Sequence, residues 1–108
     1  MTKPKTILLI CSAGITTGLL VKNMKNASRQ QNTDVEIYSA PAIIAEQVIR
    51  DQEVDALLIG PQAEYEIVRL KDALNYKNIP YKLISNEDYE LLNGRKILSD
   101  ALKMMGMG

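Results

Sequence analysis

The sequence contains no histidine, tryptophan or phenylalanine, and its only cysteine is Cys11. The absence of histidine removes the commonest general base and the commonest metal ligand, and it excludes a Cys–His protease. A single cysteine excludes an internal disulfide and a C-x-x-C redox pair, and it fits a reducing compartment such as the cytosol. We therefore expect neither a metal site nor a cofactor.

The chain also lacks an excess of charge of either sign. Its 13 Lys and Arg residues balance its 13 Asp and Glu residues, so nothing indicates binding to nucleic acid or to an anionic membrane. The longest apolar runs are too short to cross a bilayer, and the charged start of the chain precedes too few apolar residues for a signal peptide. A length of 108 residues predicts one domain with one core.

Apolar runs of strand length alternate with helical patterns along the whole chain. Strands are predicted over residues 5–10, 35–38, 55–59 and 80–84. Between and after them, helical spacing of apolar residues predicts helices over about 16–31, 41–51, 63–75 and 85–92, and a last one around 97–105. Ser85, followed by Asp88, resembles a capping box.

This alternation predicts an α/β fold with a four-stranded parallel sheet between two layers of helices. The first and third strands are the most apolar, so we place them centrally, in the order 2-1-3-4. The result is a three-layer sandwich of the Rossmann-like or low-molecular-weight-phosphatase-like kind. Ligands of such sheets bind beyond the carboxyl ends of the strands, at the point where the strand order switches.

Cys11 lies at that point, where the first strand ends and a loop of small residues opens into a helix. Backbone N–H groups at a helix start have no partner within the helix, and the helix dipole favours an anion there. A cysteine beside such a cradle is biased toward the thiolate. We interpret Cys11 as a nucleophile facing a phosphoryl group; the alternative is an ordinary buried cysteine. The predicted phosphate-binding loop consists of Ser12, Ala13, Gly14, Ile15, Thr16 and Thr17.

A second loop follows the third strand and is expected beside Cys11. It consists of Gly60, Pro61 and Gln62, and it ends the strand as a turn. In the first loop, the hydroxyls of Ser12, Thr16 and Thr17 belong either to ordinary loop and cap residues or to additional donors to phosphate. The sequence leaves these two possibilities open.

Three other α/β sites fit the residues less well. A dinucleotide site requires G-x-G-x-x-G after the first strand, and only Gly14 and Gly18 are present there. A Walker A loop requires Gly-Lys-Ser/Thr at the start of the helix, and here Gly18 is followed by Leu19. Cysteine-dependent phosphatases place an arginine six residues after the cysteine, and this position is Thr17. Without that arginine the site should hold a phosphocysteine rather than discharge it to water.

The stretch from Leu8 to Val21 closely resembles the phosphocysteine loop of lactose/cellobiose-type IIB components of the bacterial sugar phosphotransferase system. The stretch from Leu57 to Gln62, with Tyr65 following, resembles the same family. The resemblance covers nearly the whole chain and implies a single IIB domain over residues 1–108. Gly18 stands where many members carry a serine.

The resemblance implies a protein-phosphocysteine–sugar phosphotransferase. Cys11 would take a phosphoryl group from a phosphohistidine on a lactose-type IIA protein and pass it to a sugar, expected to be a β-linked disaccharide, held by a membrane IIC permease. The protein would be cytoplasmic and would meet the membrane through IIC. The alternative from another class is a non-catalytic domain whose loop only holds an anion.

Overall fold

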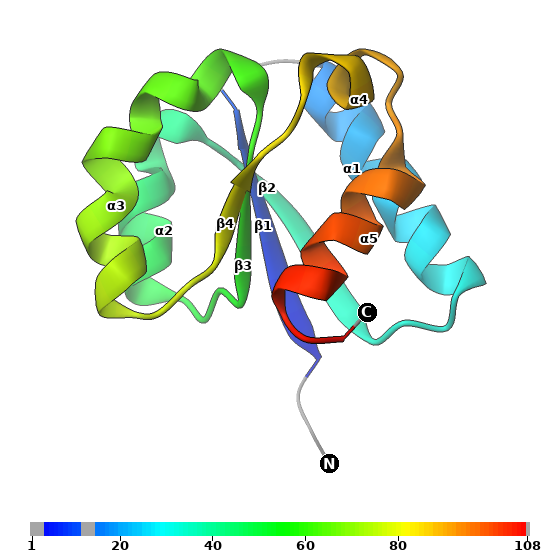
Figure 1. Ribbon diagram of the computed structural model, residues 1–108, viewed down its shortest axis with the longest axis horizontal. Coiled ribbons are helices and arrows are strands. Elements are labelled where there is room, and N and C mark those ends of the chain that lie inside the picture. The colour runs from blue at the N-terminus through cyan, green and yellow to red at the C-terminus, as the bar shows by residue number, and fades with distance from the viewer. Residues whose placement is uncertain (1–3, 12–14, 108) are drawn as a thin grey trace.

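In the computed structural model, the described residues form a four-stranded parallel sheet with helices on both faces (Figure 1). The structure describes residues 4–11 and 15–107, and for Ile15 and Thr16 it describes the backbone only. The elements, with short 3-10 helices labelled η, are β1 (Lys5–Cys11), α1 (Ile15–Gln30), β2 (Val35–Pro41), η1 (Ala42–Ile44), α2 (Ala45–Asp51), β3 (Ala56–Ile59), η2 (Pro61–Glu66), α3 (Ile67–Tyr76), β4 (Tyr81–Leu83), α4 (Asn86–Glu90) and α5 (Gly94–Met104).

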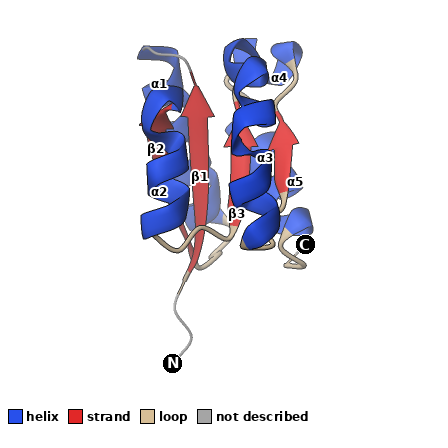
Figure 2. Ribbon diagram, turned by 90° about the vertical axis from the view of Figure 1, so that its left-hand side faces the viewer, coloured by secondary structure: helices blue, strands red, loops and turns tan. Residues whose placement is uncertain are grey.

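The strand order is β2-β1-β3-β4, which confirms the predicted order. Ile7 of β1 lies opposite Ile37 of β2 on one side and opposite Ala56 of β3 on the other. All four residues of β3 are buried, as are the last five of β1. The most apolar strands therefore occupy the centre, because only there are both faces of a strand covered by helices. All three strand pairs are parallel, and the arrows of β1 and β3 point the same way in Figure 2.

Helices α2 and α3 cover one face of the sheet, and α1, α4 and α5 cover the other (Figure 1). Neighbouring residues of β3 serve opposite faces, because side chains alternate along a strand. Leu57 packs in the cluster on the α2–α3 side, and Leu58 packs in the cluster on the α1–α5 side. Among the described residues, no helix is long and apolar enough to cross a membrane.

Two predicted helices begin differently in the structure. Pro41 ends β2 instead of opening a helix, and η1 precedes α2. After β3, the chain runs through η2, with Pro61 at its start, before α3 begins at Ile67. Proline at a helix start supplies no N–H and fixes its own φ, so it suits a tight first turn. These turns close the carboxyl edge of the sheet beside Cys11.

Helices α1 and α5 meet at Gly94, the first residue of α5. A Cβ atom at Gly94 would lie 2.6 Å from the carbonyl carbon of Asn23 and 2.7 Å from the nitrogen of Met24. The Asn23 side chain also donates to the Leu92 carbonyl oxygen at 3.0 Å. The segment between the last two predicted helices thus contains the point where α1 and the start of α5 touch backbone to backbone.

Candidate functional site

The site lies at the carboxyl edge of the two central strands. Cys11 is the last residue of β1, and only 4% of its surface is exposed. The Gly60 N–H, just beyond β3, donates to the Ile10 carbonyl oxygen at 2.8 Å. A Cβ atom at Gly60 would lie 3.1 Å from the Cys11 Cβ atom. The Gly60 turn therefore lies directly against Cys11, and glycine is the residue that leaves Cys11 its space.

The start of α1 supplies the helix terminus predicted beside Cys11. The helix begins at Ile15, four residues after the cysteine, and no acidic residue lies in its first turn. Its first N–H groups lack intrahelical partners, and no carboxylate of that turn opposes an anion. Ser12, Ala13 and Gly14 lie outside the described residues, as do the side chains of Ile15 and Thr16. Their contacts with phosphate stay a prediction.

Neither Thr16 nor Thr17 is the helix cap that the sequence allowed. The helix starts at Ile15, so Thr16 and Thr17 are the second and third residues of α1. Thr17 turns inward, and 5% of its surface is exposed. The hydroxyl is hydrogen-bonded to the Cys11 sulfur and, at 3.1 Å, to the Tyr89 hydroxyl.

Tyr89 is the site residue that the sequence analysis missed. It comes from α4, 72 positions after Thr17, and is 6% exposed. A Cβ atom at Gly60 would lie 3.6 Å from the Cε1 atom of its ring, so the ring also lines the Gly60 turn. The available signal was the strand order, which brings the segment after β4 to the same edge as Cys11. Tyr89 is the only aromatic residue in α4.

The rest of the second loop makes less contact with the cysteine. Pro61 is half-buried and opens η2, whereas Gln62 is exposed. We find no hydrogen bond between the Gln62 side chain and any other described residue. Gly60 is therefore the member of this loop that the structure brings against Cys11.

Fold and site together define a class of α/β proteins in which a buried thiol at the sheet's switch point faces the first turn of a helix. The chain belongs to the family described as PTS system, Lactose/Cellobiose specific IIB subunit, whose model matches residues 6–100. Proteins of this family are IIB components of the phosphotransferase system.

Relatives and a solved structure agree with this assignment over nearly the full chain. The oligo-beta-mannoside-specific EIIB component of Bacillus subtilis is 34% identical over 101 residues, covering 94% of this chain and 96% of that protein. The galactose-specific EIIB component of Lactococcus lactis is 29% identical, with the same two coverages. The cellobiose-specific IIB structure from Borrelia burgdorferi is 28% identical, has a TM-score of 0.76, and covers 94% of this chain and 92% of its own.

Proposed function

We propose that Cys11 carries a phosphoryl group from a phosphohistidine on a IIA protein to a sugar held by a membrane IIC protein. IIB components are phosphotransferases, and they work with IIA and IIC partners. The observation that carries the proposal is the position of the thiol. It is the only one in the chain, it ends the central strand, and it is hydrogen-bonded to Thr17 in the first turn of α1.

The chemistry consists of two displacements at phosphorus. In the first, the Cys11 thiolate forms an S–P bond, the N–P bond of the phosphohistidine breaks, and the electron pair goes to nitrogen. In the second, a sugar hydroxyl forms an O–P bond, and the S–P bond breaks with its electron pair on sulfur. The hydroxyl proton goes to a base of the sugar-binding partner. Cys11 returns as the thiolate, so the cycle requires no cofactor.

The phosphoryl oxygens need donors on the protein side of Cys11. We assign this role to backbone N–H groups of residues 12–17, which surround the start of α1. The Ser12 and Thr16 hydroxyls are additional donors in this proposal. Thr17 stands where a cysteine-dependent phosphatase would have arginine, and its hydroxyl contacts sulfur. This arrangement suits storage and transfer of the group more than its hydrolysis.

The transfer is tested by sugar phosphorylation in a phosphoenolpyruvate-driven relay that ends in a lactose-type IIA, with membranes that contain IIC. Cys11→Ser should abolish sugar phosphate formation. The matched control is Cys11→Ser with Gln52→Cys, which restores a thiol at an exposed position beyond α2. This double variant should stay inactive. Activity in Cys11→Ser would overturn the proposal. No activity of the wild type, with a IIA and membranes that work with a related IIB, would leave the anion-holding domain as the better account.

The sugar is proposed to be a β-linked disaccharide. The relatives are named for oligo-beta-mannoside and for galactose, and the Borrelia burgdorferi structure for cellobiose. These names differ although the chains align over nearly their full length, so the choice of sugar belongs to the IIC partner in this proposal. The protein would then work in the cytoplasm and meet the membrane only through IIC.

A further inference from the structure

A row of three side chains leads from Cys11 into the interior of the protein. The Thr17 hydroxyl lies between the Cys11 sulfur and the Tyr89 hydroxyl and is hydrogen-bonded to both. All three side chains belong to buried residues, and they come from β1, α1 and α4. A hydroxyl has one hydrogen to donate, and it can accept as well. If Thr17 donates to sulfur, it is free to accept from Tyr89.

We infer that Tyr89 is a positioning residue for phosphoryl transfer: its hydroxyl donates to Thr17 and thereby directs the Thr17 hydrogen to the Cys11 sulfur. The inference rests on the proposed role of Cys11 as the phosphoryl carrier. A thiolate accepts hydrogen bonds, and a donor held in place stabilises it. Thr17 touches the reacting atom, and Tyr89 acts through it.

The thiolate appears at both ends of the cycle. It is the nucleophile when the S–P bond forms at the expense of the N–P bond, and it is the leaving group when the S–P bond breaks and the sugar O–P bond forms. A fixed donor at sulfur therefore favours release of the phosphoryl group, and before acceptance it holds the sulfur in one position. The first turn of α1, which packs against Cys11, contains no carboxylate. The residue of the next turn that lies against Cys11 is Gly60, which has no charged side chain.

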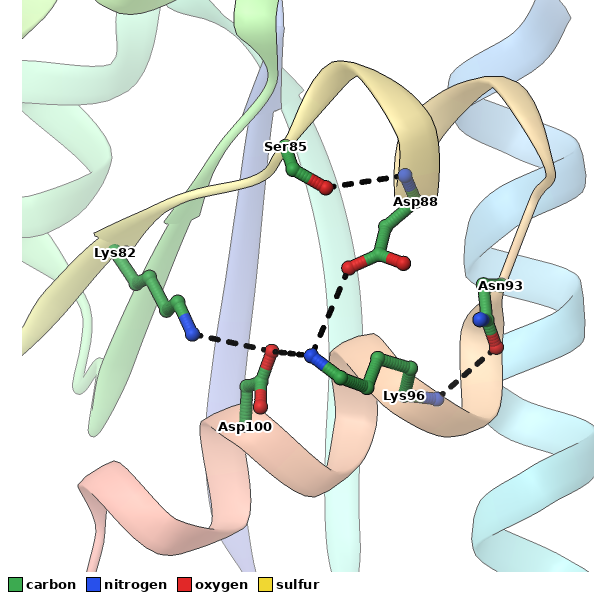
Figure 3. Close-up of polar contacts among 6 residues, drawn as sticks. All are labelled: Lys82, Ser85, Asp88, Asn93, Lys96 and Asp100. Atoms are coloured by element: carbon green, nitrogen blue, oxygen red, sulfur yellow. Dashed lines mark hydrogen bonds and ion pairs between the residues drawn. The ribbon is translucent and has the colours of Figure 1, made fainter.

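Polar contacts anchor the start of α4, the helix that carries Tyr89; Figure 3 shows those of Ser85 and Asp88. The Ser85 hydroxyl accepts from the Asp88 N–H at 3.1 Å, and the Tyr89 N–H donates to the Ser85 carbonyl oxygen at 3.0 Å. The Lys96 ammonium of α5 reaches the Asp88 carboxylate at 3.8 Å and the Asp100 carboxylate at 3.3 Å. A helix of five residues is thus tied to α5 immediately before the tyrosine.

The test uses alkylation of Cys11, which is the only thiol, by iodoacetamide across a range of pH. Tyr89→Phe should lower the alkylation rate at pH 7 by about five-fold, the effect of one lost hydrogen bond, and should move the rate profile to higher pH. Thr17→Val should act in the same direction. The double variant should be no slower than Thr17→Val alone, because Tyr89 acts through Thr17.

Tyr81→Phe is the matched control, because Tyr81 is a half-buried tyrosine that packs on the opposite face of the sheet. It should leave the alkylation rate and profile unchanged. The inference would be overturned if Cys11 of Tyr89→Phe were alkylated at the wild-type rate. It would also be overturned if the rate losses of Tyr89→Phe and Thr17→Val added up in the double variant. Thr17→Ser keeps the hydroxyl and should retain most of the rate, which separates the hydrogen bond from packing.

Alkylation needs no IIA, IIC or sugar, so this result stands apart from the test of the carrier role. If Tyr89→Phe alkylates like wild type while Cys11→Ser still abolishes sugar phosphorylation, only the inference about Tyr89 fails. If Tyr89→Phe slows alkylation while Cys11→Ser still supports sugar phosphorylation, the row of side chains is real but the carrier proposal fails.

Discussion

Cys11 combines a fixed position with a polar partner at its sulfur. It ends a buried strand, which holds its position, and its sulfur meets a hydroxyl in the first turn of a helix. Structural cysteines lie buried among apolar groups and are inert. Cys11 differs from them, because its sulfur has the Thr17 hydroxyl as a hydrogen-bonding partner.

Gly18 makes helix α1 less stable than alanine would at the same position. It lies in the first part of α1, and no heavy atom lies within 4 Å of the position of an added Cβ atom. Gly18→Ala should therefore stabilise the protein by about 0.5–1 kcal/mol, because glycine inside a helix costs conformational entropy. Urea unfolding followed by circular dichroism measures the change. A loss of stability would show that Gly18 has a packing role that this geometry does not contain.

At the scale of elements, the strand pattern predicted nearly the whole sheet. The apolar runs gave four strands in the right order, because both faces of the central strands must be buried. The capping role of Ser85 was also predictable and is confirmed. The starts of α2 and α3 were not, because Pro41 and Pro61 each suit more than one kind of turn and only packing against the sheet edge decides between them.

The contact between α1 and α5 depends on Gly94. Gly94→Ala should destabilise the protein by about 1–3 kcal/mol, the usual cost of forcing an extra group into a packed contact. The atoms in the way are backbone atoms of Asn23 and Met24, so the helices must separate to make room. Urea unfolding again gives the value. Gly18→Ala is the matched control, and an equal gain in stability for both variants would contradict the account of this contact.

The ion pairs of Asp100 tie β4 to α5. Lys82 approaches its carboxylate at 3.2 Å and Lys96 at 3.3 Å. Burial raises the pKa of Asp100, but hydrogen bonds and charge from Lys82 and Lys96 outweigh burial, and the pKa is lowered from 3.8. A lowered pKa in the folded state stabilises the protein above the unfolded-state value, and this contribution is lost as the pH falls through the folded-state value.

Asp100→Asn should therefore lower the free energy of unfolding at pH 7, by about 1 kcal/mol or less for such a partly exposed cluster. The difference from wild type should shrink as the pH falls below 3.8, through the lowered pKa of Asp100 in the folded protein. Urea unfolding at several pH values measures it. Asp72→Asn is the control, because Asp72 is exposed on α3 and we find no ion pair to it among the described residues. A difference that does not change with pH would contradict the assignment to this carboxylate.

At the scale of the whole molecule, one sheet serves two hydrophobic clusters. Leu57 and Leu58 are adjacent in β3, almost fully buried, and belong to opposite clusters. Leu57→Ala and Leu58→Ala should each destabilise the protein by about 2–5 kcal/mol, the range for truncating a buried leucine. Each variant should still unfold in one transition, because both clusters pack on the same sheet and neither can stay folded without it. Different unfolding midpoints measured by circular dichroism and by tyrosine fluorescence would contradict a single transition.

The contact in the site that could not be predicted from the sequence joins residues far apart in the chain. Cys11 and the Gly60 turn were predictable, because both follow apolar strands and parallel strands end at the same edge. The contact between Thr17 and Tyr89 joins residues 72 positions apart. It depends on how α4 turns after β4, and no periodicity in a five-residue helix encodes that direction.

The central claim is that Cys11 itself carries the phosphoryl group, and the intact mass of the protein tests it most directly. The chain is incubated with a phosphorylated lactose-type IIA, without IIC or sugar, so that any phosphoryl group accepted by the chain stays on it. Wild type should gain the mass of one phosphoryl group, and Cys11→Ser should gain none. A phosphoryl group on Cys11→Ser, or none on wild type with a IIA that phosphorylates a related IIB, would contradict the account.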